Sequence, residues 1–341
     1  MNIRNMPRSL THFLFIRLLQ LIPTVLGVLL IVFILSRILP GNPIAAILGP
    51  KATPENVERV IRELGLNKDY LTQFVEYLQK IIMFDFGRSY IMNVEVRDLI
   101  LSRLPASFEL VIVAYILATL IGLPLGVVAA LKKGTWVDDV VRVIGVIGIS
   151  MPTIWLGMVM QIVFGIYLGF PVGERIDPLL APKPITGFML IDTLLEGNIY
   201  GFVDATKRIA LPALTLAFPL SGLLMRLVRA NMVEVLLSDY IRTAKMKKLP
   251  QNIILYKHAL KNALIPVVTI MGLYFAVIVT GDIIIETIFS WPGIGRLIYE
   301  AVMLRDYMVI QGTVIFISII YVLVNLVVDI VYFYIDPRIK I

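Results

Sequence analysis

The sequence predicts an all-α integral membrane protein with six transmembrane helices. Of its 341 residues, 58% are apolar and 16% are charged, and the mean hydropathy is +0.87. Soluble domains are roughly 45–50% apolar and about a quarter charged. The apolar excess is gathered into runs of about 20 residues, the length of a helix that crosses a bilayer. These two observations define the fold class.

Six apolar runs account for the six helices. The first is longer than the roughly 7–15 residues of a signal-peptide core, so we expect it to be retained as a span. The fourth is the shortest and contains Pro212 and Pro219. Prolines persist in membrane helices where neighbouring helices compensate the freed carbonyls, which favours a packed bundle. The predicted spans are about Leu18–Leu35, Leu110–Leu131, Val143–Phe170, Ile209–Leu227, Ala263–Ile285 and Met308–Tyr334.

The long loop after the first span carries helix signals of its own. Thr53 suits an N-cap, Pro54 the first helical position and Gly65 the position after a helix end. A second helical pattern runs from Tyr70 to about Ile82. We therefore divide the chain into residues 1–39 with the first span, a helical outer loop at 40–106, a membrane core at 107–334 that includes a cytoplasmic loop at 230–262, and a tail at 335–341.

The charges of the short loops predict the orientation. The net charge is +7, and basic residues gather at both termini, in the turn with Lys132 and Lys133, and in segment 239–266. Short positive loops stay in the cytoplasm. We therefore expect a multi-pass protein of the cell (plasma or inner) membrane with both termini cytoplasmic, and with residues 171–208 and 286–307 outside. Because topology accounts for the basic charge, nucleic acid is not an expected partner.

The cytoplasmic segment "DYIRTAKMKKLPQNIILYKHALKNALIP", residues 239–266, has six Lys or Arg and one Asp. Asp239 can cap a first helix, and Pro250 ends it because the residue before a proline is driven out of the α region. A second helix then continues into the fifth span. We call this helix–turn–helix segment the elbow. Its residues alone equally fit a basic loop that only obeys the charge rule and touches anionic lipid.

Several fragments of the chain occur in the order of a known family. The elbow has "RTAKMKK…HALKNALIP", and "RLLQLIPTVLGVLLIVFILSRILPGNP", "DFGRSY", "RLPASFEL", "ETIFSWPGIGRLIYEAVMLRDYMVIQG" and "DPRIK" surround it. Together they resemble the permease subunits of ATP-binding-cassette (ABC) importers, specifically the first of the two permeases of dipeptide and oligopeptide systems. The resemblance covers nearly the whole chain and implies the type I importer permease fold.

The resemblance implies that the first helix of the elbow is a coupling helix, which seats in a groove of a separate ATPase subunit. Small residues at its contact face, here Thr243 and Ala244, allow close seating. One position departs from the family, because Lys248 replaces a glycine, which implies either a differently shaped turn or altered docking. The residues carried over to this role are Arg242, Thr243, Ala244, Lys245, Lys248, Leu249 and His258.

The segment "FSWPGIG", residues 289–295, has two interpretations. Trp291 alone fits an aromatic belt at the membrane interface. The resemblance implies instead an outer gate that faces an extracytoplasmic substrate-binding protein, formed by Trp291, Pro292, Gly293 and Gly295. The implied partners are that binding protein, a second permease subunit, two cytoplasmic ATPase subunits and the lipid bilayer.

Small and polar residues inside the spans suggest how the helices meet. Glycines at 122, 126, 145 and 148 allow close helix approach. Hydroxyl and amide side chains inside a bundle most often bond a neighbouring helix, and a translocation path is the alternative. The candidate path residues are Ser150, Thr153, Gln161 and Asn325, with Thr215, Ser221 and Thr280 as further polar positions.

The sequence also bears on enzymes and other transporters. It contains no phosphate-binding GxxxxGK[ST] motif, so we expect a non-catalytic subunit that takes its energy from a partner, and no cofactor. With no Cys and two distant His, thiolate metal sites and an intramembrane protease are poor fits. A secondary transporter predicts two echoing halves, which we do not find. The favoured substrate class is dipeptides or oligopeptides; short oligosaccharides and nickel are the alternatives within the same architecture.

Overall fold

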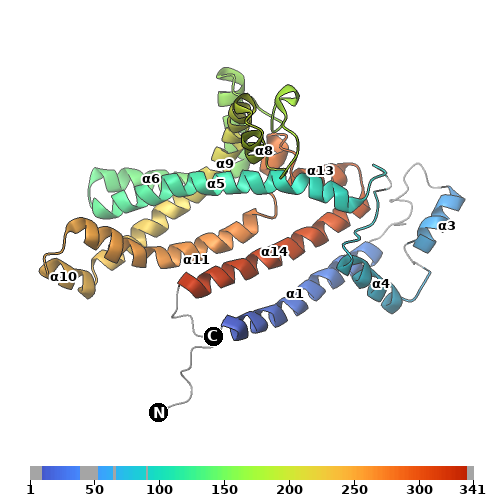
Figure 1. Ribbon diagram of the computed structural model, residues 1–341, viewed down its shortest axis with the longest axis horizontal. Helices are drawn as coiled ribbons and strands as arrows, with labels where there is room; N and C mark the ends of the chain where they lie inside the picture. The colour runs from blue at the N-terminus through green and yellow to red at the C-terminus, as the bar shows by residue number, and fades with distance from the viewer. Residues whose placement is uncertain (1–9, 39–52, 64–66, 90, 336–341) are drawn as a thin grey trace, which may run out of the picture.

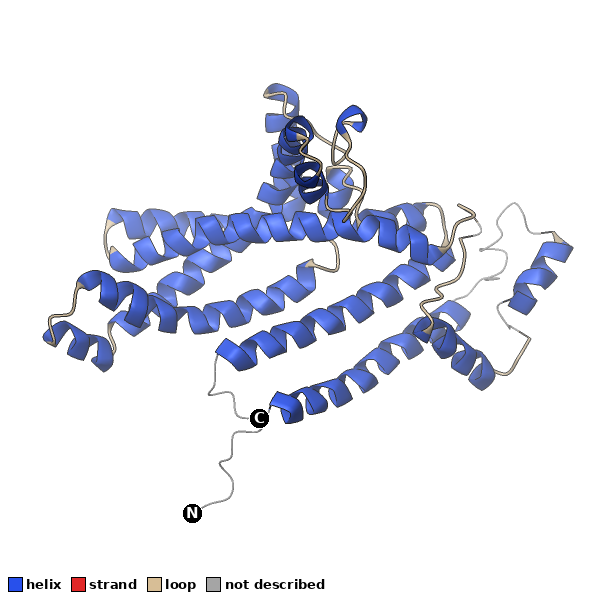
Figure 2. Cartoon of the chain, viewed as in Figure 1, coloured by secondary structure: helices blue, strands red, loops and turns tan. Residues whose placement is uncertain are grey.

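The computed structural model describes residues 10–38, 53–63, 67–89 and 91–335 (Figure 1). In these residues every regular element is a helix, and the pairing of Arg88 with Glu95 is an isolated bridge (Figure 2). The all-α class is therefore confirmed. Arg4, Arg8, Gly65 and the proposed tail after residue 335, with Arg338 and Lys340, lie outside the described residues.

The long loop after the first span contains the two expected helices. They are α3, Pro54–Glu63, and α4, Tyr70–Ile82. Asp69 caps α4, since its carboxylate accepts a hydrogen bond from Thr72 N at 2.9 Å. The expected end of the loop at residue 106 lies inside the next helix, α5, which begins at Val96.

Among the described residues, four helices are long and apolar enough to cross a membrane, and a bent helix pair adds a fifth if it forms one span. The four are α5, Val96–Leu131; α9, Ile199–Leu236; the continuous segment Ile253–Ile278; and α14, Tyr307–Ile335. The predicted first span falls on α1, Leu10–Ile38, whose apolar part, Leu19–Leu35, is shorter than the helices counted as candidate spans. The helices match five of the six predicted spans in position, and the third span differs in shape.

The third span is broken rather than continuous. It consists of α6, Trp136–Ser150, and α7, Thr153–Met160, with the π-helical segment η3, Gln161–Tyr167, and the two halves meet at 101°. The break lies at Met151, whose backbone is extended with ψ 123°. Because Pro152 drives the residue before it out of the α region, the chain leaves α6 there. The span predicted over Val143–Phe170 is therefore bent at Pro152 and does not form one continuous helix.

The fourth span forms the centre of the bundle. Although it contains Pro212 and Pro219, α9 is an unbroken helix of 38 residues. In its most apolar 18-residue stretch, 67% is buried inside the molecule. It packs most extensively on α5. A side chain at Gly122 of α5 would lie 2.8 Å from Ser221 O, and one at Gly222 of α9 would lie 2.6 Å from Gly145 O. Glycine therefore permits the expected close approach of α5 and α6 to α9.

The fifth span ends earlier than predicted. Its helix α11, Lys261–Ile278, stops before Gly281, which has φ +98°. Asp282 then caps a short helix, α12, Ile283–Ile288, by accepting hydrogen bonds from Ile284 N and Ile285 N. The apolar residues 279–285 thus belong to a turn and a new helix. A further helix, α13, Ile294–Met303, precedes α14.

The helices are arranged with two functional ends (Figure 1). In the bundle, α6 and α11 flank α9, α14 packs on α11, and α1 packs on α14. The elbow with α10, Asp239–Met246, lies at one end, whereas α4 and α13 lie at the other. Segment 168–198, with η4, Pro178–Leu180, and α8, Met189–Leu195, covers the outer part of α5 and α9. Each end carries one group of the residues that the sequence singled out.

Candidate functional site

The first half of the elbow is α10 and its closing turn. Ser238 takes the N-cap position, so Asp239 is the first helical residue rather than the predicted cap. The helix ends in a Schellman turn, because Leu249 N donates to Ala244 O at 3.4 Å and Lys248 N donates to Lys245 O at 2.9 Å. Lys248 has φ +52°. The turn therefore keeps the left-handed form with a lysine in it, at a strain of about 1–2 kcal/mol.

The second half of the elbow runs without interruption into the fifth span. It begins with the π-helical segment η5, Ile253–Leu260, and continues as α11. Lys261, at the junction, keeps helical angles of φ −54° and ψ −44°. The predicted continuity from elbow to span is confirmed. Extended π-helix is rare in proteins and is often found at functional sites.

The inner side of the elbow packs against α9. Ile241 and Ala244 of α10 share one apolar cluster with Ile254 and Ala259 of η5 and with Met232 of α9. Ala244 is only 8% exposed. The small side chain of Ala244 therefore contributes to the internal packing of the elbow and does not lie on the exposed face of α10.

The outer side of α10 is open. Asp239, Arg242, Thr243 and Met246 are exposed and recur at i, i+3, i+4 and i+7, which places them on one face of the helix opposite Ile241 and Ala244. Met246 is 70% exposed. An exposed methionine on a mostly polar helix face is an adaptable contact for a partner. This face carries two of the predicted docking residues.

The remaining docking residues lie around this face. Lys245, Lys248 and Leu249 are exposed, and His258 is half-buried in η5. The carbonyl of His258 accepts hydrogen bonds from Asn262 Nδ2 at 2.8 Å and Tyr240 Oη at 3.5 Å. The backbone of His258 therefore helps to join the two halves of the elbow.

The opposite end of the molecule has a buried carboxyl group that the sequence analysis did not identify. Glu286 of α12 is 1% exposed and accepts hydrogen bonds from Ser107 Oγ at 2.6 Å and Arg296 N at 3.0 Å. Ser107 Oγ in turn accepts one from Ile294 N at 2.8 Å. We call Glu286, Ser107 and the backbone of residues 293–296 the latch, since they fasten α5, α12 and α13 together.

Burial and close packing define the chemistry of the latch. Burial raises the pKa of Glu286 to about 7, against the opposing effect of its hydrogen bonds from Ser107 and from backbone N–H groups. A side chain at Gly293 would collide with the Glu286 carboxyl group and with Ser107 Oγ. Gly293 is therefore required so that the backbone can approach the acid.

Trp291 lies beside the latch and is buried. Its side chain is 1% exposed, and Nε1 donates to Ala106 O at 2.8 Å. The interpretation of Trp291 as part of an interfacial belt was therefore wrong. Gly293 and Gly295 are buried as well, and Pro292 is half-buried, so the predicted gate residues form the interior of the outer end rather than its surface.

A buried ion pair joins segment 168–198 to the outer part of α5. Arg175 Nη2 lies 2.5 Å from Glu109 Oε2 and donates to Gly187 O at 2.8 Å. The other carboxylate oxygen of Glu109 accepts from Leu190 N at 2.7 Å. The Arg175 guanidinium also lies 5.9 Å from the ring centroid of Trp291. This separation is within cation–π range. The segment is thus attached to Glu109 of α5 and to Trp291, which lies beside the latch.

A second acid closes the segment on itself. Asp192 of α8 accepts hydrogen bonds from the backbone N–H groups of Ile185, Thr186 and Gly187 and from Thr186 Oγ1. Burial alone would raise the pKa of Asp192, but these hydrogen bonds outweigh it and the pKa is lowered. Asp192 therefore holds the loop as a carboxylate.

The candidate path residues do not form one cluster of hydrogen bonds. Ser150 and Thr153 flank the break between α6 and α7, and Gln161 Nε2 donates across to Ile288 O of α12 at 3.1 Å. Asn325 Nδ2 donates to Tyr321 O in its own helix at 2.9 Å. Of these, only Gln161 shows the expected bond to a neighbouring helix. The hydroxyls of Thr215, Ser221 and Thr280 also bond their own helices.

The sequence contained weak signals for the residues that were missed. Glu286 precedes a Pro- and Gly-rich stretch in which the backbone can wrap an acid, and Ser107 lies in the quoted fragment "RLPASFEL". Their contact depends on tertiary packing, since 179 positions separate the two residues. Among the described residues no group of three or more His, Cys, Asp or Glu is placed to hold a metal ion.

Two family models and several known proteins match this chain. The family described as binding-protein-dependent transport system inner membrane component matches residues 122–341, and the N-terminal family of such membrane components matches residues 10–111. The dipeptide transport system permease protein of Alkalihalophilus pseudofirmus is 41% identical, with 95% of this chain and 98% of the relative covered. The di/tripeptide transport system permease protein of Pseudomonas aeruginosa is 40% identical over 95% and 97%. The dipeptide transport system permease protein of Escherichia coli K12 is 37% identical over 96% and 98%.

Proposed function

Because the chain belongs to the family of binding-protein-dependent transport system inner membrane components, we propose that it is the transmembrane permease subunit of an ATP-driven peptide importer. The observation that carries the substrate class is the identity of 37–41%, over nearly the full length, to permeases named for dipeptides or tripeptides. In this proposal the chain forms half of the translocation pathway and hydrolyses no nucleotide. A second permease, two ATPase subunits and an extracytoplasmic binding protein complete the importer.

The elbow is the proposed connection to the ATPase. The contact face is the exposed side of α10, with Arg242, Thr243 and Met246 at its centre. Lys245, Lys248 and Leu249 border it, whereas Ala244 and His258 support it from inside. This assignment keeps the segment that the resemblance indicated and moves the contact from Ala244 to the opposite side of the helix.

The continuity of the elbow with two spans supports a rigid-body mechanism. The apolar cluster around Ile241 and Ala244 fixes α10 to α9, and η5 leads directly into α11. Closure of the ATPase pair around ATP would displace α10, and both spans would move with it. The pathway would then alternate between inward-open and outward-open states, as in other transitions driven by rigid-body motion.

The outer end is proposed to face the binding protein. The surfaces offered to it are α3, α4 and segment 168–198, while Trp291, Pro292, Gly293 and Gly295 form the packed base on which an outer gate rests. Arg175 connects this segment to the base through Glu109 and Trp291. A movement of the bundle would therefore reach segment 168–198 through the continuous chain and through the contacts of Arg175 with Glu109 and Trp291.

The break in the third span supports a pathway assignment for Ser150 and Thr153. Non-helical backbone at membrane depth is tolerated where it is buried in protein or lines a water-filled cavity. The two hydroxyls stand on either side of the extended Met151. Gln161, at the end of α7, and Asn325, on α14, are retained as further candidates for the pathway lining.

The proposed orientation places the elbow and both termini in the cytoplasm. Supporting this, α1 begins and α14 ends close to one another, since Arg17 Nε lies 3.3 Å from Asp329 Oδ2. The turn with Lys132 and Lys133, between α5 and α6, has the positive charge of a cytoplasmic loop. Six passages through the membrane return the chain to the side on which it started.

The docking proposal is tested by the substitution Met246→Glu in the assembled importer. Docking would bury the new negative charge, which should release the ATPase subunits. Peptide-stimulated ATP hydrolysis in proteoliposomes should therefore fall by tenfold or more, because a loss of about 1.4 kcal/mol in docking free energy lowers the affinity tenfold. Membrane insertion should be unchanged, because Met246 is exposed. Retention of both the ATPase subunits and full stimulation would refute the docking face.

Met83→Glu is the matched control for this experiment. Met83 is 76% exposed, follows α4 at the opposite end of the molecule, and receives the same chemical change. It should keep the ATPase subunits bound. The substrate class is tested separately, by uptake of labelled dipeptides compared with oligosaccharides and nickel. Uptake that persists without any ATPase subunit would instead indicate a secondary transporter.

A further inference from the structure

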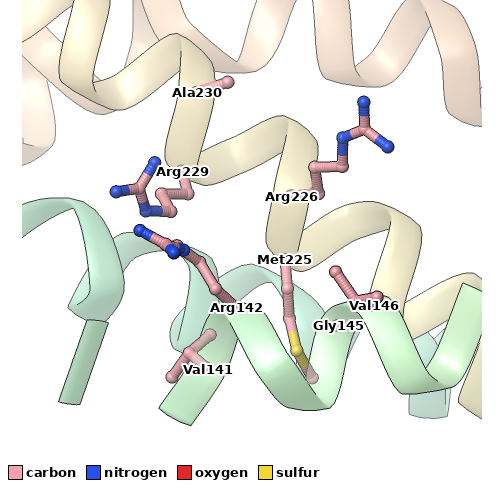
Figure 3. A pocket seen from close by; sticks show the side chains of 8 residues that line it. All are labelled: Val141, Arg142, Gly145, Val146, Met225, Arg226, Arg229 and Ala230. Atoms are coloured by element: carbon pink, nitrogen blue, oxygen red, sulfur yellow. The ribbon is translucent and has the colours of Figure 1, made fainter. Parts of the chain in front are cut away.

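A cavity between α6 and α9 remains unexplained by the proposed transport function. It has a volume of about 300 Å³, and its lining includes Arg142, Arg226 and Arg229 together with Gly145, Met225 and Ala230 (Figure 3). We call it the α6–α9 groove. In Figure 3, the side chains of Arg142 and Arg229 extend toward one another, and Arg226 projects from α9 on the other side of Met225. Three arginine residues therefore line one small and otherwise apolar groove, and the guanidinium group of Arg226 points away from the other two.

The carboxylates in the groove do not balance these positive charges. Arg229 makes a paired contact with Asp138, with Nε at 2.5 Å from Oδ1 and Nη2 at 2.7 Å from Oδ2. Arg142 lies 3.5 Å from Asp139. This second pair is exposed and screens little of the arginine's charge. The ion pairs formed among the described residues leave Arg226 without a carboxylate partner. The groove thus keeps at least one excess positive charge.

The fixed arginine shapes the groove for an anion. Asp138 also accepts a hydrogen bond from Gly134 N at 3.0 Å, so the acid is tied to the α5–α6 turn while it holds Arg229. Arg142 and Arg229 have Asp139 and Asp138 beside them, so the positive charge of the groove that no carboxylate among the described residues compensates is that of Arg226. Guanidinium groups match phosphate oxygens in charge and geometry. The chemistry of the groove therefore favours a phosphate group.

The depth of the groove indicates where that phosphate comes from. Arg142 directly precedes the apolar run that begins at Val143, and Arg226 and Arg229 close the apolar run of α9. Trp136, at the start of α6, is 75% exposed. Such exposure is typical of an aromatic residue at the membrane interface. In the proposed orientation, these positions lie near the lipid headgroups on the side that carries Lys132 and Lys133.

The surface next to the groove fits lipid chains. Val143 and Val146 of α6 are 57% and 59% exposed, and Val146 also lines the groove. A molecule with its phosphate among the arginines can lay apolar chains along this side of α6. Basic pockets between helices on the cytoplasmic side are suited to such headgroups.

We propose that the α6–α9 groove binds the phosphate of an anionic phospholipid from the cytoplasmic leaflet. Arg226 and Arg142 contact the phosphate oxygens, Arg229 is held in place by Asp138 as the third positive group, and the acyl chains follow α6. The inference rests on the orientation in the proposed function, which places this end of the bundle in the inner leaflet. Since α9 leads into the elbow, the lipid would also brace the span that carries the coupling helix.

The experiment measures lipid retention by the assembled importer, with phosphatidylglycerol as the probe in phosphatidylcholine nanodiscs and native mass spectrometry as the readout. Arg226→Gln and Arg142→Gln should each weaken phosphatidylglycerol retention about fivefold, from the roughly 1 kcal/mol per basic residue at a membrane surface. Ala230→Phe, which fills the groove without changing charge, should weaken retention as well. Arg97→Gln, an equal charge change at an exposed site of the outer end, should leave it unchanged.

Four results would overturn the inference. Equal losses for Arg97→Gln and Arg226→Gln would mean that only total charge attracts the lipid. Unchanged lipid retention with a raised KM for peptide in Arg226→Gln would assign the groove to the substrate. Dissociation of the two permeases in Arg226→Gln would assign it to their interface. Retention of free inorganic phosphate as strongly as of the lipid would exclude the headgroup as the source. Peptide uptake by the unmodified importer is measured in parallel, so a failure of the transport proposal appears separately.

Discussion

The elbow and the latch lie at opposite ends of the molecule and are built in opposite ways. In the elbow, the outer face of α10 exposes Met246 at 70% and Arg242 to the solvent, and small residues fill only its inner side. In the latch, Glu286 is 1% exposed, and its two carboxylate oxygens each accept a hydrogen bond. The elbow thus has exposed side chains that a partner can contact, whereas the polar groups of the latch are hydrogen-bonded to one another within the chain.

The difference indicates which end is adaptable and which is preformed. A surface that exchanges a partner keeps apolar and charged groups free, while a base that must hold several helices in place satisfies its polar groups internally. On this comparison, substitutions in the latch should act on stability first. Substitutions on the outer face of the elbow should act on coupling first.

The largest effect is expected for Gly293→Ala in the latch. The new methyl group would displace the Glu286 carboxyl group and Ser107, so two buried hydrogen bonds would be lost and the site overpacked. We expect the free energy of unfolding to fall by about 4 kcal/mol, from roughly 1–3 kcal/mol per buried unsatisfied group plus strain. Thermal unfolding of the purified protein measures this.

Gly27→Ala serves as the control, because no atom lies within 4 Å of a side chain at that position. It should leave the melting temperature unchanged or slightly raised. If Gly293→Ala had the same melting temperature as Gly27→Ala, the latch would not be tightly packed, and the contrast with the elbow would be lost.

The second effect is a pH dependence of the latch. Glu286 has its pKa raised from 4.5 to about 7 by burial, so the folded protein holds a proton that the unfolded chain releases. The contribution of protonated Glu286 to the free energy of unfolding is therefore fully present below about pH 4.5. It is lost as the pH rises through about 7, and the total loss is about 3 kcal/mol. Hydrogen exchange of residues 286–297 should speed up over this pH range.

Glu286→Gln should remove this pH dependence, since the amide does not titrate. The matched change Glu196→Gln, at an exposed acid of the outer segment, should retain it. A pH profile that is the same in Glu286→Gln and in the unmodified protein would assign the effect to another group.

A third substitution probes the inner side of the elbow. Ala244→Leu should overpack the cluster of Ile241, Ile254 and Ala259 and lower stability by about 2 kcal/mol. Thr243→Leu, one position away and exposed, should change stability by less than about 0.5 kcal/mol. Denaturant melts of both variants measure this difference, and a larger loss for Thr243→Leu would reverse the assignment of the two faces of α10.

The smallest effect is expected for the turn after α10, where Lys248 has φ +52°. Lys248→Gly should relieve this strain and raise stability by up to about 1 kcal/mol, since glycine also loses more backbone entropy on folding. The matched position is Lys247, which has an ordinary φ of −72°. Lys247→Gly should instead lower stability by about 0.5–1 kcal/mol. Denaturant melts compare the two variants, and changes of the same sign in both would argue against the Schellman turn.

The sequence was sufficient where a signal was local. Apolar runs located the spans, and caps and spacing located α3 and α4. The prolines alone did not predict where a helix breaks. Pro152 breaks the third span, whereas Pro212 and Pro219 lie inside an unbroken α9. The two cases differ because burial on several sides holds α9 together, and neighbouring helices are not visible in a sequence.

The candidate site was predictable only in part for the same reason. The elbow is contiguous in sequence, so its two helices and their turn could be recognised. Which face of α10 is exposed depends on its packing against α9, so the burial of Ala244 could not be predicted from the sequence. Ser107 and Glu286 meet only in the folded chain, and Trp291 is covered by residues of α5 and segment 168–198.

The unbroken length of α9 has a mechanical consequence. The helix has 38 residues. At a rise of about 1.5 Å per residue, it acts as a lever of about 57 Å. A tilt of about 10° at the elbow would carry its far end sideways by about 10 Å. Next to that far end, Asn198 Nδ2 donates to Leu180 O, so the contacts of segment 168–198 would be the first to change after a small displacement at the elbow.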